Sequence, residues 1–244
     1  MWPGFSREWG VIDHVLSYAD VDFVIMAAGS GTRMQANMKK QWIPIENHPL
    51  FVYTLLRLLA FGADSLIVVV HLDDAEATAN ILQSSGISKT NCRIVTGGND
   101  RQESVFHGIS VAKRKFVAVH DAARPFVDKV DIAAVVQRAH ITGAATLGYP
   151  ARDTLVRTQD EAITEVVPRD SLWQVQTPQV FLRERLLLAH EKAIDDGFHG
   201  TDDTALVARL GYHVDVVRGS ALNVKITEPG DAMYLRLWEG RKCE

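Results

Sequence analysis

The sequence predicts an α/β protein with a Rossmann-like, mostly parallel sheet, helices on both of its faces and a protruding β-hairpin. Short apolar, β-branched runs such as Val21 to Ala27 and Ser65 to His71 indicate buried strands. Segments with helical spacing of apolar residues alternate with these runs, which is typical of βαβ units. The alternation breaks between Thr154 and Val167, where two short strands with a polar turn predict the hairpin.

The predicted elements follow in order from Val21. Gly29 and Gly31 stop the first strand at once, which indicates that it enters a loop. Asp73 or Asp74 is the expected cap of the second helix, and Pro229 stands near the first turn of the closing helix. The expected strands are 21–27, 65–71, 92–96, 116–120, 144–147, 213–217 and 222–226, and the expected helices are 50–61, 73–85, 102–112, 128–142, 182–195, 203–210 and 229–239.

The hairpin is expected from strands 154–158 and 162–167, joined by a turn at 159–161. Apolar and polar residues alternate along it, and a two-stranded hairpin alone is marginal in water. We therefore expect it to pack on another surface, for which a second subunit is the natural candidate. The sequence predicts one domain, 21–244, with an arm at about 149–172 and an N-terminal appendage at 1–20.

Composition argues against several classes of protein. The 244 residues are 47% hydrophobic and 23% charged, which suits a soluble chain that needs no disulfide or metal to form a core. The net charge is −4, so nothing draws the chain to nucleic acid or to anionic membranes. No apolar run approaches the roughly 20 residues of a membrane span. Two cysteines without a Cys-x-x-Cys pair suit a reducing cytoplasm.

The end of the first strand carries the main functional signal. Ligands of open α/β sheets bind beyond the carboxyl ends of the strands. Here Ala27 to Met34 reads Ala-Ala-Gly-Ser-Gly-Thr-Arg-Met, and Lys39 and Lys40 follow. Glycine lets backbone N–H groups approach an anion, so a phosphate loop and a plain tight turn are both open interpretations. Met34 replaces the third glycine of a dinucleotide fingerprint, and no Gly-Lys pair exists for a P-loop.

The loop resembles the Ala-Ala-Gly-x-Gly-x-Arg-Met signature of the 2-C-methyl-D-erythritol 4-phosphate cytidylyltransferases. Further blocks resemble that family in the same order and with similar spacing, from Val21 to about Asp231. One such block is weak alone, but eight in order are specific. The blocks are Lys40-Gln41, Gly97 to Val105, His120 to Pro125, Arg152 to Thr154, Leu172-Trp173, Gln176 to Gln179, Thr201-Asp202 and Asn223 to Thr227.

The resemblance implies an enzyme of the non-mevalonate isoprenoid pathway that joins CTP to 2-C-methyl-D-erythritol 4-phosphate and releases pyrophosphate. The attacking phosphate is already an anion, so catalysis would rest on positioning and on cations. Mg²⁺, or another divalent cation, is the implied cofactor. The implied catalytic residues are Arg33, Lys40, Lys225 and Arg169; the implied nucleotide-binding residues are Ala27, Ala28, Gly29, Gly31, Gly98, Asn99, Ser104, Asp121 and Ala122; and the implied substrate-binding residues are Arg124, Thr154, Arg169, Thr177, Thr201 and Lys225.

Three further expectations come from the resemblance. The segment from Gly97 to Ser104 would read cytosine through fixed backbone groups and a hydroxyl. Asp121 would lie near the ribose or the metal, although no metal ligand is assigned. A homodimer is implied, in which Thr154 and Arg169 of the arm serve the neighbouring subunit's site. Apart from the resemblance, His120 is expected to be a packed or hydrogen-bonded histidine rather than a catalyst.

Some alternatives stay open. Lys39 stands where the family usually has proline and could replace Lys40, while Pro168 replaces the acid that usually precedes the arm arginine. A ribitol-5-phosphate-type polyol phosphate cytidylyltransferase and a non-catalytic nucleotide-binding protein are the alternative functions. The paired alanines before Gly29 and the Asp-Ala-Ala-Arg-Pro block favour the methylerythritol substrate.

Overall fold

The computed structural model describes residues 18–29, 39–45, 47–231 and 233–235. In these ranges seven strands form one sheet in the spatial order β11-β7-β10-β6-β1-β4-β5. Neighbouring strands are parallel except at β10, which runs antiparallel to β6 and β7, so the predicted mostly parallel sheet is confirmed. The strands are β1 (Val21–Ala27), β4 (Leu66–Val70), β5 (Cys92–Thr96), β6 (Phe116–Asp121), β7 (Ala144–Pro150), β10 (Trp173–Leu182) and β11 (Asp215–Arg218).

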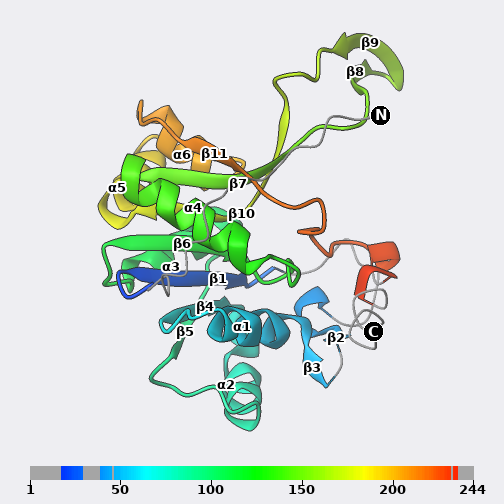
Figure 1. Cartoon of the computed structure of the whole chain (residues 1–244). Helices are drawn as coiled ribbons and strands as arrows, with labels where there is room; N and C mark the ends of the chain where they lie inside the picture. Colours follow the sequence, from blue (N-terminus) through cyan, green and yellow to red (C-terminus); the bar gives the residue numbers. More distant parts are fainter. Residues whose placement is uncertain (1–17, 30–38, 46, 232, 236–244) are drawn as a thin grey trace.

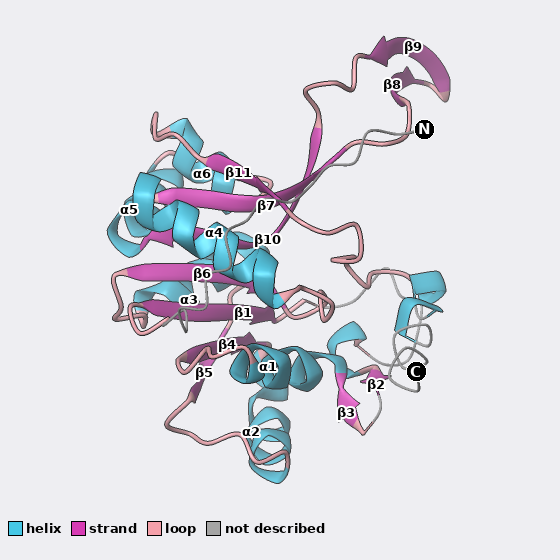
Figure 2. Cartoon of the chain, viewed as in Figure 1, coloured by secondary structure: helices cyan, strands magenta, loops and turns pink. Residues whose placement is uncertain are grey.

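Helices cover both faces of the sheet, as predicted (Figures 1 and 2). Phe23 and Ile25 of β1 pack in one buried cluster with α1, α2 and α4, whereas Val24 packs in another with α3, α5 and α6. A strand buried on both faces explains the unbroken apolar run in the sequence. The helices are α1 (Leu50–Ala60), α2 (Ala75–Ser84), α3 (Arg101–Ser110), α4 (Lys129–Thr142), α5 (Arg183–Asp195) and α6 (Asp203–Arg209); the short elements are η2 (Lys40–Trp42), η3 (Leu72–Asp74), η4 (Pro229–Asp231), β2 (Pro44–Ile45) and β3 (His48–Pro49).

Aspartates begin three of the helices. The side chains of Asp100, Asp128 and Asp202 accept hydrogen bonds from backbone N–H groups in the first turns of α3, α4 and α6. Each bond satisfies a donor that a helix N-terminus leaves unpaired. Because α3 and α4 directly follow parallel strands, their capped ends lie at the carboxyl edge of the sheet, where a ligand would bind.

The predicted hairpin projects away from the sheet as a separate two-stranded arm (Figure 1). Its strands are β8 (Leu155–Gln159) and β9 (Ala162–Val167). Asp160 and Glu161 form the turn with φ of 50° and 64°, the left-handed geometry that matches the twist of a two-residue hairpin. The pairing of Val156 with Val166 and of Thr158 with Ile163 places these side chains on one face, where the three apolar ones are exposed.

Two predictions about strands are wrong. The sequence does not predict the strand at 173–182, because three glutamines and Pro178 hide the apolar pattern of β10. The apolar residues at 222–226 predict a strand, but this segment is irregular in the structure. There Asn223 donates its side-chain N–H to the Thr177 carbonyl at 2.9 Å, and the N–H of Ile226 donates to the Ala123 carbonyl at 2.8 Å. These bonds tie the segment to β10 and to the turn after β6 instead of to one strand ladder.

The ends of the chain are described only in part. The predicted appendage at 1–20 lies outside the described residues except for 18–20, of which Tyr18 is buried against Phe23. The predicted helix at 229–239 is seen only as η4 and as helical residues 233–235. No helix in the described ranges combines the length and the apolar character needed to span a membrane.

Candidate active site

An ion cluster lies at the carboxyl end of β6, where Asp121 is the last residue. Its carboxylate lies 2.8 Å from Nζ of Lys225 and 3.6 Å from Nε of Arg124. Asp121 is only 8% exposed, whereas the side chain of Lys225 is 35% exposed. The cluster therefore joins a buried carboxylate to a cation that reaches solvent.

The charges in this cluster stabilise one another. Burial alone would raise the pKa of Asp121, but Lys225, Arg101 and Arg124 hold that pKa well below its usual range. Burial lowers the pKa of Arg124, and the charge of Asp121 opposes that shift. Asp121 is consequently ionised at neutral pH and fixes the two cations beside it.

A buried threonine and histidine support the backbone of this turn. Oγ1 of Thr177 accepts from the N–H of Asp121 at 3.0 Å and lies 3.0 Å from Nδ1 of His120. Nε2 of His120 lies 3.2 Å from the carbonyl of Arg124. A carbonyl can only accept, so Nε2 carries the proton and Nδ1 accepts from the threonine hydroxyl. Burial lowers the pKa of His120 to about 4, which keeps the ring neutral.

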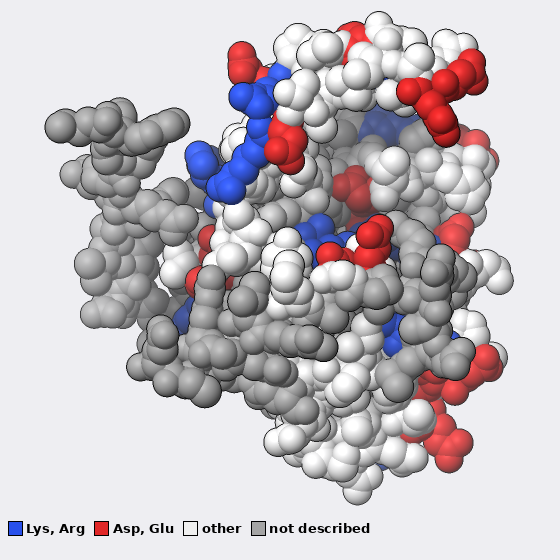
Figure 3. All heavy atoms as spheres, turned by 90° about the vertical axis from the view of Figure 1, so that its right-hand side faces the viewer, with Lys and Arg blue, Asp and Glu red and all other residues white. Residues whose placement is uncertain are grey.

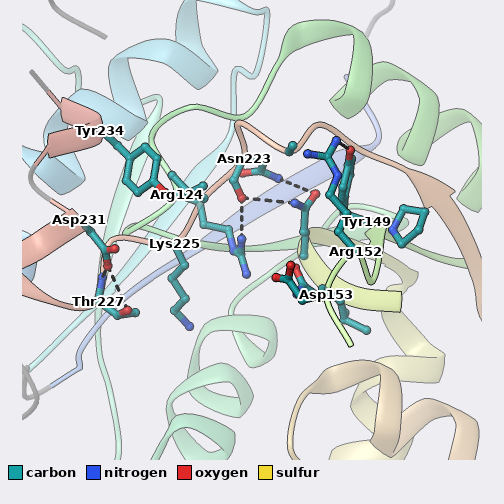
Figure 4. Close-up of a pocket in the computed structure, with 15 residues that line it drawn as sticks. Arg124, Tyr149, Arg152, Asp153, Asn223, Lys225, Thr227, Asp231 and Tyr234 are labelled. Atoms are coloured by element: carbon teal, nitrogen blue, oxygen red, sulfur yellow. Dashed lines mark hydrogen bonds between the residues drawn. The ribbon is translucent and has the colours of Figure 1, made fainter. Parts of the chain in front are cut away.

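The segment that carries Lys225 is anchored on the same turn. The carbonyl of buried Asn223 accepts from the Arg124 guanidinium at 2.7 Å (Figure 4), and the N–H of Ile226 donates to the Ala123 carbonyl at 2.8 Å. Lys225 stands between these two anchors. Its amine is thereby delivered to a carboxylate about a hundred residues away in the sequence.

Gly29, shortly after β1, lies next to one lysine of the pair. A Cβ on Gly29 would lie 3.6 Å from Cε and 3.9 Å from Nζ of Lys40, so that side chain runs along the glycine. Lys39 instead pairs with Asp74 at 2.9 Å. Because Lys39 is paired with Asp74, the structure favours Lys40 as the functional lysine of the two.

The side chains of α3 shape the segment 97–104. Oγ of Ser104 accepts from the N–H of Gly98 at 3.0 Å and donates to the Asp100 carbonyl at 2.7 Å. The carboxylate of Glu103 accepts from the backbone and side-chain N–H groups of Asn99 at 2.7 and 2.9 Å. The position of the first turn of α3 therefore sets the conformation of the loop before it.

This loop also touches the glycine loop. A Cβ on Gly97 would lie 2.7 Å from Oγ of Ser104 and 2.8 Å from Cβ of Ala28, closer than real Cβ atoms come. Glycine is needed here for close approach rather than for an unusual φ. The strand ends of β1 and β5 thus bring two of the predicted nucleotide-binding segments into contact.

A pocket of about 410 Å³ opens beside the cluster, and Figure 4 shows side chains that line it. Arg124 and Lys225 form part of its wall, and Tyr149 and Arg152 come from the base of the arm. The Arg152 guanidinium stacks over the Tyr149 ring, 4.6 Å from its centroid. On this side of the molecule, basic and acidic side chains gather around a hollow (Figure 3).

Several predicted residues are not brought to this cluster or are not described. Thr154 and Arg169 do not line the pocket of their own chain, and Arg169 donates to the carbonyl of Arg152. Thr201 is exposed beside the start of α6. Gly31 and Arg33 lie outside the described residues.

Sequence reasoning gave no functional role to three residues that the structure places at or near the cluster. Asn223 and His120 anchor the turn that carries Asp121, and Arg101 at the start of α3 pairs with Asp203 at 2.8 Å. Asn223, His120 and Arg101 each fall inside a block that resembles the cytidylyltransferases. The blocks were the available signal, but the sequence did not show which neighbours these side chains meet.

The fold and this site define an α/β nucleotide-binding protein, with cations and a buried carboxylate gathered at the carboxyl edge of an open sheet. A family model described as IspD, 2-C-methyl-D-erythritol 4-phosphate cytidylyltransferase, matches residues 21–236. The chain therefore belongs to the 2-C-methyl-D-erythritol 4-phosphate cytidylyltransferase family.

The chain is also similar to individual members of this family. The 2-C-methyl-D-erythritol 4-phosphate cytidylyltransferase of Halalkalibacterium halodurans is 40% identical over 216 residues, which cover 86% of this chain and 93% of that protein. The corresponding protein of Syntrophus aciditrophicus is 40% identical over 227 residues, 89% of this chain and 97% of its own. The crystal structure of the Thermus thermophilus enzyme superposes with a TM-score of 0.77 at 33% identity, covering 90% of this chain and 99% of that one.

Proposed function

We propose that this chain transfers the cytidylyl group of CTP to 2-C-methyl-D-erythritol 4-phosphate and releases pyrophosphate, a step of the non-mevalonate isoprenoid pathway. The observation that carries the proposal is the Asp121, Lys225 and Arg124 cluster at the carboxyl edge, together with Lys40 beside Gly29. Residues 21–244, with the arm at about 149–172, would act as one nucleotidyltransferase domain.

The chemistry suits a site made of cations. An oxygen of the sugar-alcohol phosphate attacks the α-phosphorus of CTP; a new P–O bond forms, and the bond to the leaving pyrophosphate breaks. No proton needs to be removed from the attacking anion. The difficulty is to bring anions together and to stabilise the charge that spreads over the transition state, which fixed cations can do.

We assign these tasks to residues in two groups. Lys40, with Arg33 from the loop, would stabilise the triphosphate around the α-phosphorus. Lys225 would hold the phosphate of the second substrate at the pocket beside Arg124. The segment from Gly97 to Ser104 would select cytosine, because its backbone is fixed by its own side chains.

Mg²⁺ fits this site as a partner of the nucleotide rather than as a resident ion. No group of three or more His, Cys, Asp or Glu side chains in the described ranges could hold a metal by itself. Mg²⁺ commonly keeps several waters and binds through one or two carboxylates and substrate phosphates. Asp121 would be the carboxylate here, and the ion would neutralise phosphate charge.

We also propose a homodimer whose arm completes the neighbouring site. Val156, Ile163 and Val166 share one face of the hairpin and are 40%, 65% and 62% exposed. A two-stranded hairpin with such a face needs a partner surface. Thr154 and Arg169, which do not line the pocket of their own chain, would then reach the site of the second subunit.

Pyrophosphate release tests the proposal. With CTP and Mg²⁺, we expect release with 2-C-methyl-D-erythritol 4-phosphate and little with ribitol 5-phosphate; the reverse preference would overturn the substrate. Lys225→Ala should lower turnover about a hundred- to thousandfold while CTP binding is largely kept. Lys192→Ala, which removes an exposed lysine paired with Asp195 at 3.5 Å, is the control. Equal loss of binding and turnover in the Lys225 variant would contradict its role.

A further inference from the structure

A buried aspartate and histidine lie in contact behind the segment 97–104, apart from the cluster at β6. Asp203 and His190 are both 0% exposed. The carboxylate of Asp203 lies 3.0 Å from Nε2 of His190 and 2.8 Å from the Arg101 guanidinium. Burial alone would raise the pKa of Asp203, but Arg101 and His190 together hold it below its usual value. A carboxylate is thus kept ionised inside the protein by two donors.

Arg101 connects this pair to the candidate active site. Its side chain is 35% exposed, against 1% for Asp203, so the contact joins a partly exposed cation to a buried carboxylate. The charge of Asp203 raises the pKa of Arg101 most, and Asp121 and Asp202 add to the shift. Asp121 is the buried acid of the cluster, so the charge of Arg101 acts both on the buried pair and on the site.

A second side chain of the same turn makes a parallel connection. Gln102 donates to the carbonyl of Phe198 at 3.1 Å and accepts from the N–H of Gly200 at 3.0 Å. The first turn of α3 is therefore attached at two consecutive residues to the segment 198–203. On its other side, Glu103 and Ser104 of α3 hold the loop 97–100. The first turn of α3 therefore connects the buried pair on one side to the loop 97–100 on the other.

Stability alone does not account for this arrangement. Removing charges from water is costly, and well-packed apolar residues often replace a buried ion pair without loss of stability. An ion pair does fix direction, because Asp203 accepts from two donors at defined angles. This property is useful where a helix start must be held in one position.

We propose that Asp203 and His190 are positioning residues for base selection. They hold Arg101 and, through it, the first turn of α3, so that the segment 97–104 presents fixed groups to cytosine. A rigid polar edge rejects uracil because the wrong base leaves buried groups unpaired, whereas a loose edge adapts to both. The inference rests on the proposed cytidylyl transfer and adds the residues that maintain its selectivity.

Asp203→Asn tests this role, since it keeps the size of the side chain and removes its charge. We measure steady-state kinetics of pyrophosphate release with CTP and with UTP at saturating 2-C-methyl-D-erythritol 4-phosphate. The KM for CTP should rise about 10- to 100-fold, which is the effect of a small misplacement remote from the chemistry. The preference for CTP over UTP in kcat/KM should fall, while the KM for the second substrate stays within about twofold.

The matched control is Asp196→Asn. It removes the carboxylate of another aspartate–arginine pair, Asp196 with Arg209 of α6, at 2.7 Å and on the surface. We expect no change in either nucleotide's kinetics. An equal change in both variants would show a general electrostatic effect and would overturn the proposal.

A double-mutant cycle shows whether Asp203 acts through Arg101. Arg101→Gln should raise the KM for CTP and lower selectivity, and the double variant should be little worse than Arg101→Gln alone. If the losses of the two single variants add up in the double variant, the proposal is overturned. An equal fall in kcat for CTP and UTP with KM unchanged would also overturn it, because it would show that the pair has only a structural role. If Asp203→Asn does not fold, Arg101→Gln decides, and unchanged KM and selectivity there would overturn the proposal.

The proposed function and this inference fail in different ways. A folded wild type that releases no pyrophosphate would refute the transfer reaction. Calorimetry would then compare CTP and UTP binding to the wild type and to Arg101→Gln. Preserved CTP preference in the variant would refute the positioning role, and its loss would support that role.

Discussion

Among single residues, Gly97 leaves no room for a side chain at the point where two loops meet. Its missing Cβ leaves space for Ser104 and Ala28, so Gly97→Ala must push two segments of the candidate nucleotide site apart. We expect the KM for CTP to rise about tenfold and stability to fall by about 1–3 kcal/mol. Kinetics and denaturant unfolding measure the two effects. Gly230→Ala is the control, because a Cβ there meets nothing within 4 Å; equal effects of both substitutions would contradict the steric argument.

His120 makes the stability depend on pH. Its pKa falls from 6.5 to about 4 on folding, so between these values the unfolded chain binds more protons than the folded one. Above pH 6.5 the ring is neutral in both states and does not lower the free energy of unfolding. As the pH falls from 6.5 toward 4, preferential protonation of the unfolded chain lowers the free energy of unfolding by about 3 kcal/mol in total. Unfolding in denaturant at about pH 7 and about pH 4.5 should show a larger drop for the wild type than for His120→Gln, which does not titrate.

The control for His120 is His199→Gln, since the His199 side chain is 78% exposed. This variant should keep the pH dependence of the wild type. If His120→Gln loses as much stability on acidification as the wild type, the buried ring is not the source of the effect.

Among the elements, the arm carries an avoidable strain at its turn. Glu161 has φ of 64°, a conformation that costs an L-residue about 1–2 kcal/mol and costs glycine nothing. Glu161→Gly relieves this strain but loses more conformational entropy on folding. The net effect should stabilise the hairpin by up to about 1 kcal/mol. Hydrogen exchange of the amides in β8 and β9 should slow.

Asp160→Gly is the matched variant for that turn. Aspartate tolerates the left-handed region better than glutamate, so the gain at Asp160, where φ is 50°, should be smaller. Faster exchange in Glu161→Gly, or an equal gain at both positions, would show that backbone strain does not limit the arm.

The elements differ in how far the sequence could predict them. Strand β4 was predictable because it is buried on both faces and reads Leu-Ile-Val-Val-Val. Strand β10 was not, since it passes the site and carries Gln176, Thr177 and Gln179 for hydrogen bonds rather than for a core. The segment 222–226 shows the reverse error: its apolar residues suggested a strand, but its hydrogen bonds go to β10 and to the turn after β6. The polar residues that β10 contributes near the site thus interrupt the apolar pattern by which a strand is predicted.

The candidate site was predictable to a similar degree. Motif blocks gave Asp121, Arg124 and Lys225, and the structure brings these three together. Motifs could not indicate that Asp203 pairs with Arg101, because that contact joins α6 to α3 across 102 positions of the chain. Contacts between distant helices depend on packing, which one sequence does not display.

At the scale of the whole molecule, the proposed site is larger than one chain. The pocket beside Lys225 is open, and the arm of the same chain projects away from the sheet (Figure 1). In a two-fold dimer built on the exposed face of the hairpin, both arms make the same contact, so an arm that reaches the other subunit's pocket would complete both sites. The arm would then bring the two halves of each site together.

Mixing two inactive variants tests this arrangement. Lys225→Ala removes a residue of the pocket, and Arg169→Ala removes a residue of the arm. In a dimer that contains one of each, both changes fall on one site if the arm crosses over, and the other site is intact. Random mixing makes half of the dimers mixed, so activity should return to about a quarter of the wild-type value. If Arg169 served its own chain, every site would carry one change, and the mixture would stay as inactive as its components; Lys225→Ala mixed with itself after the same dissociation and reassociation is the control.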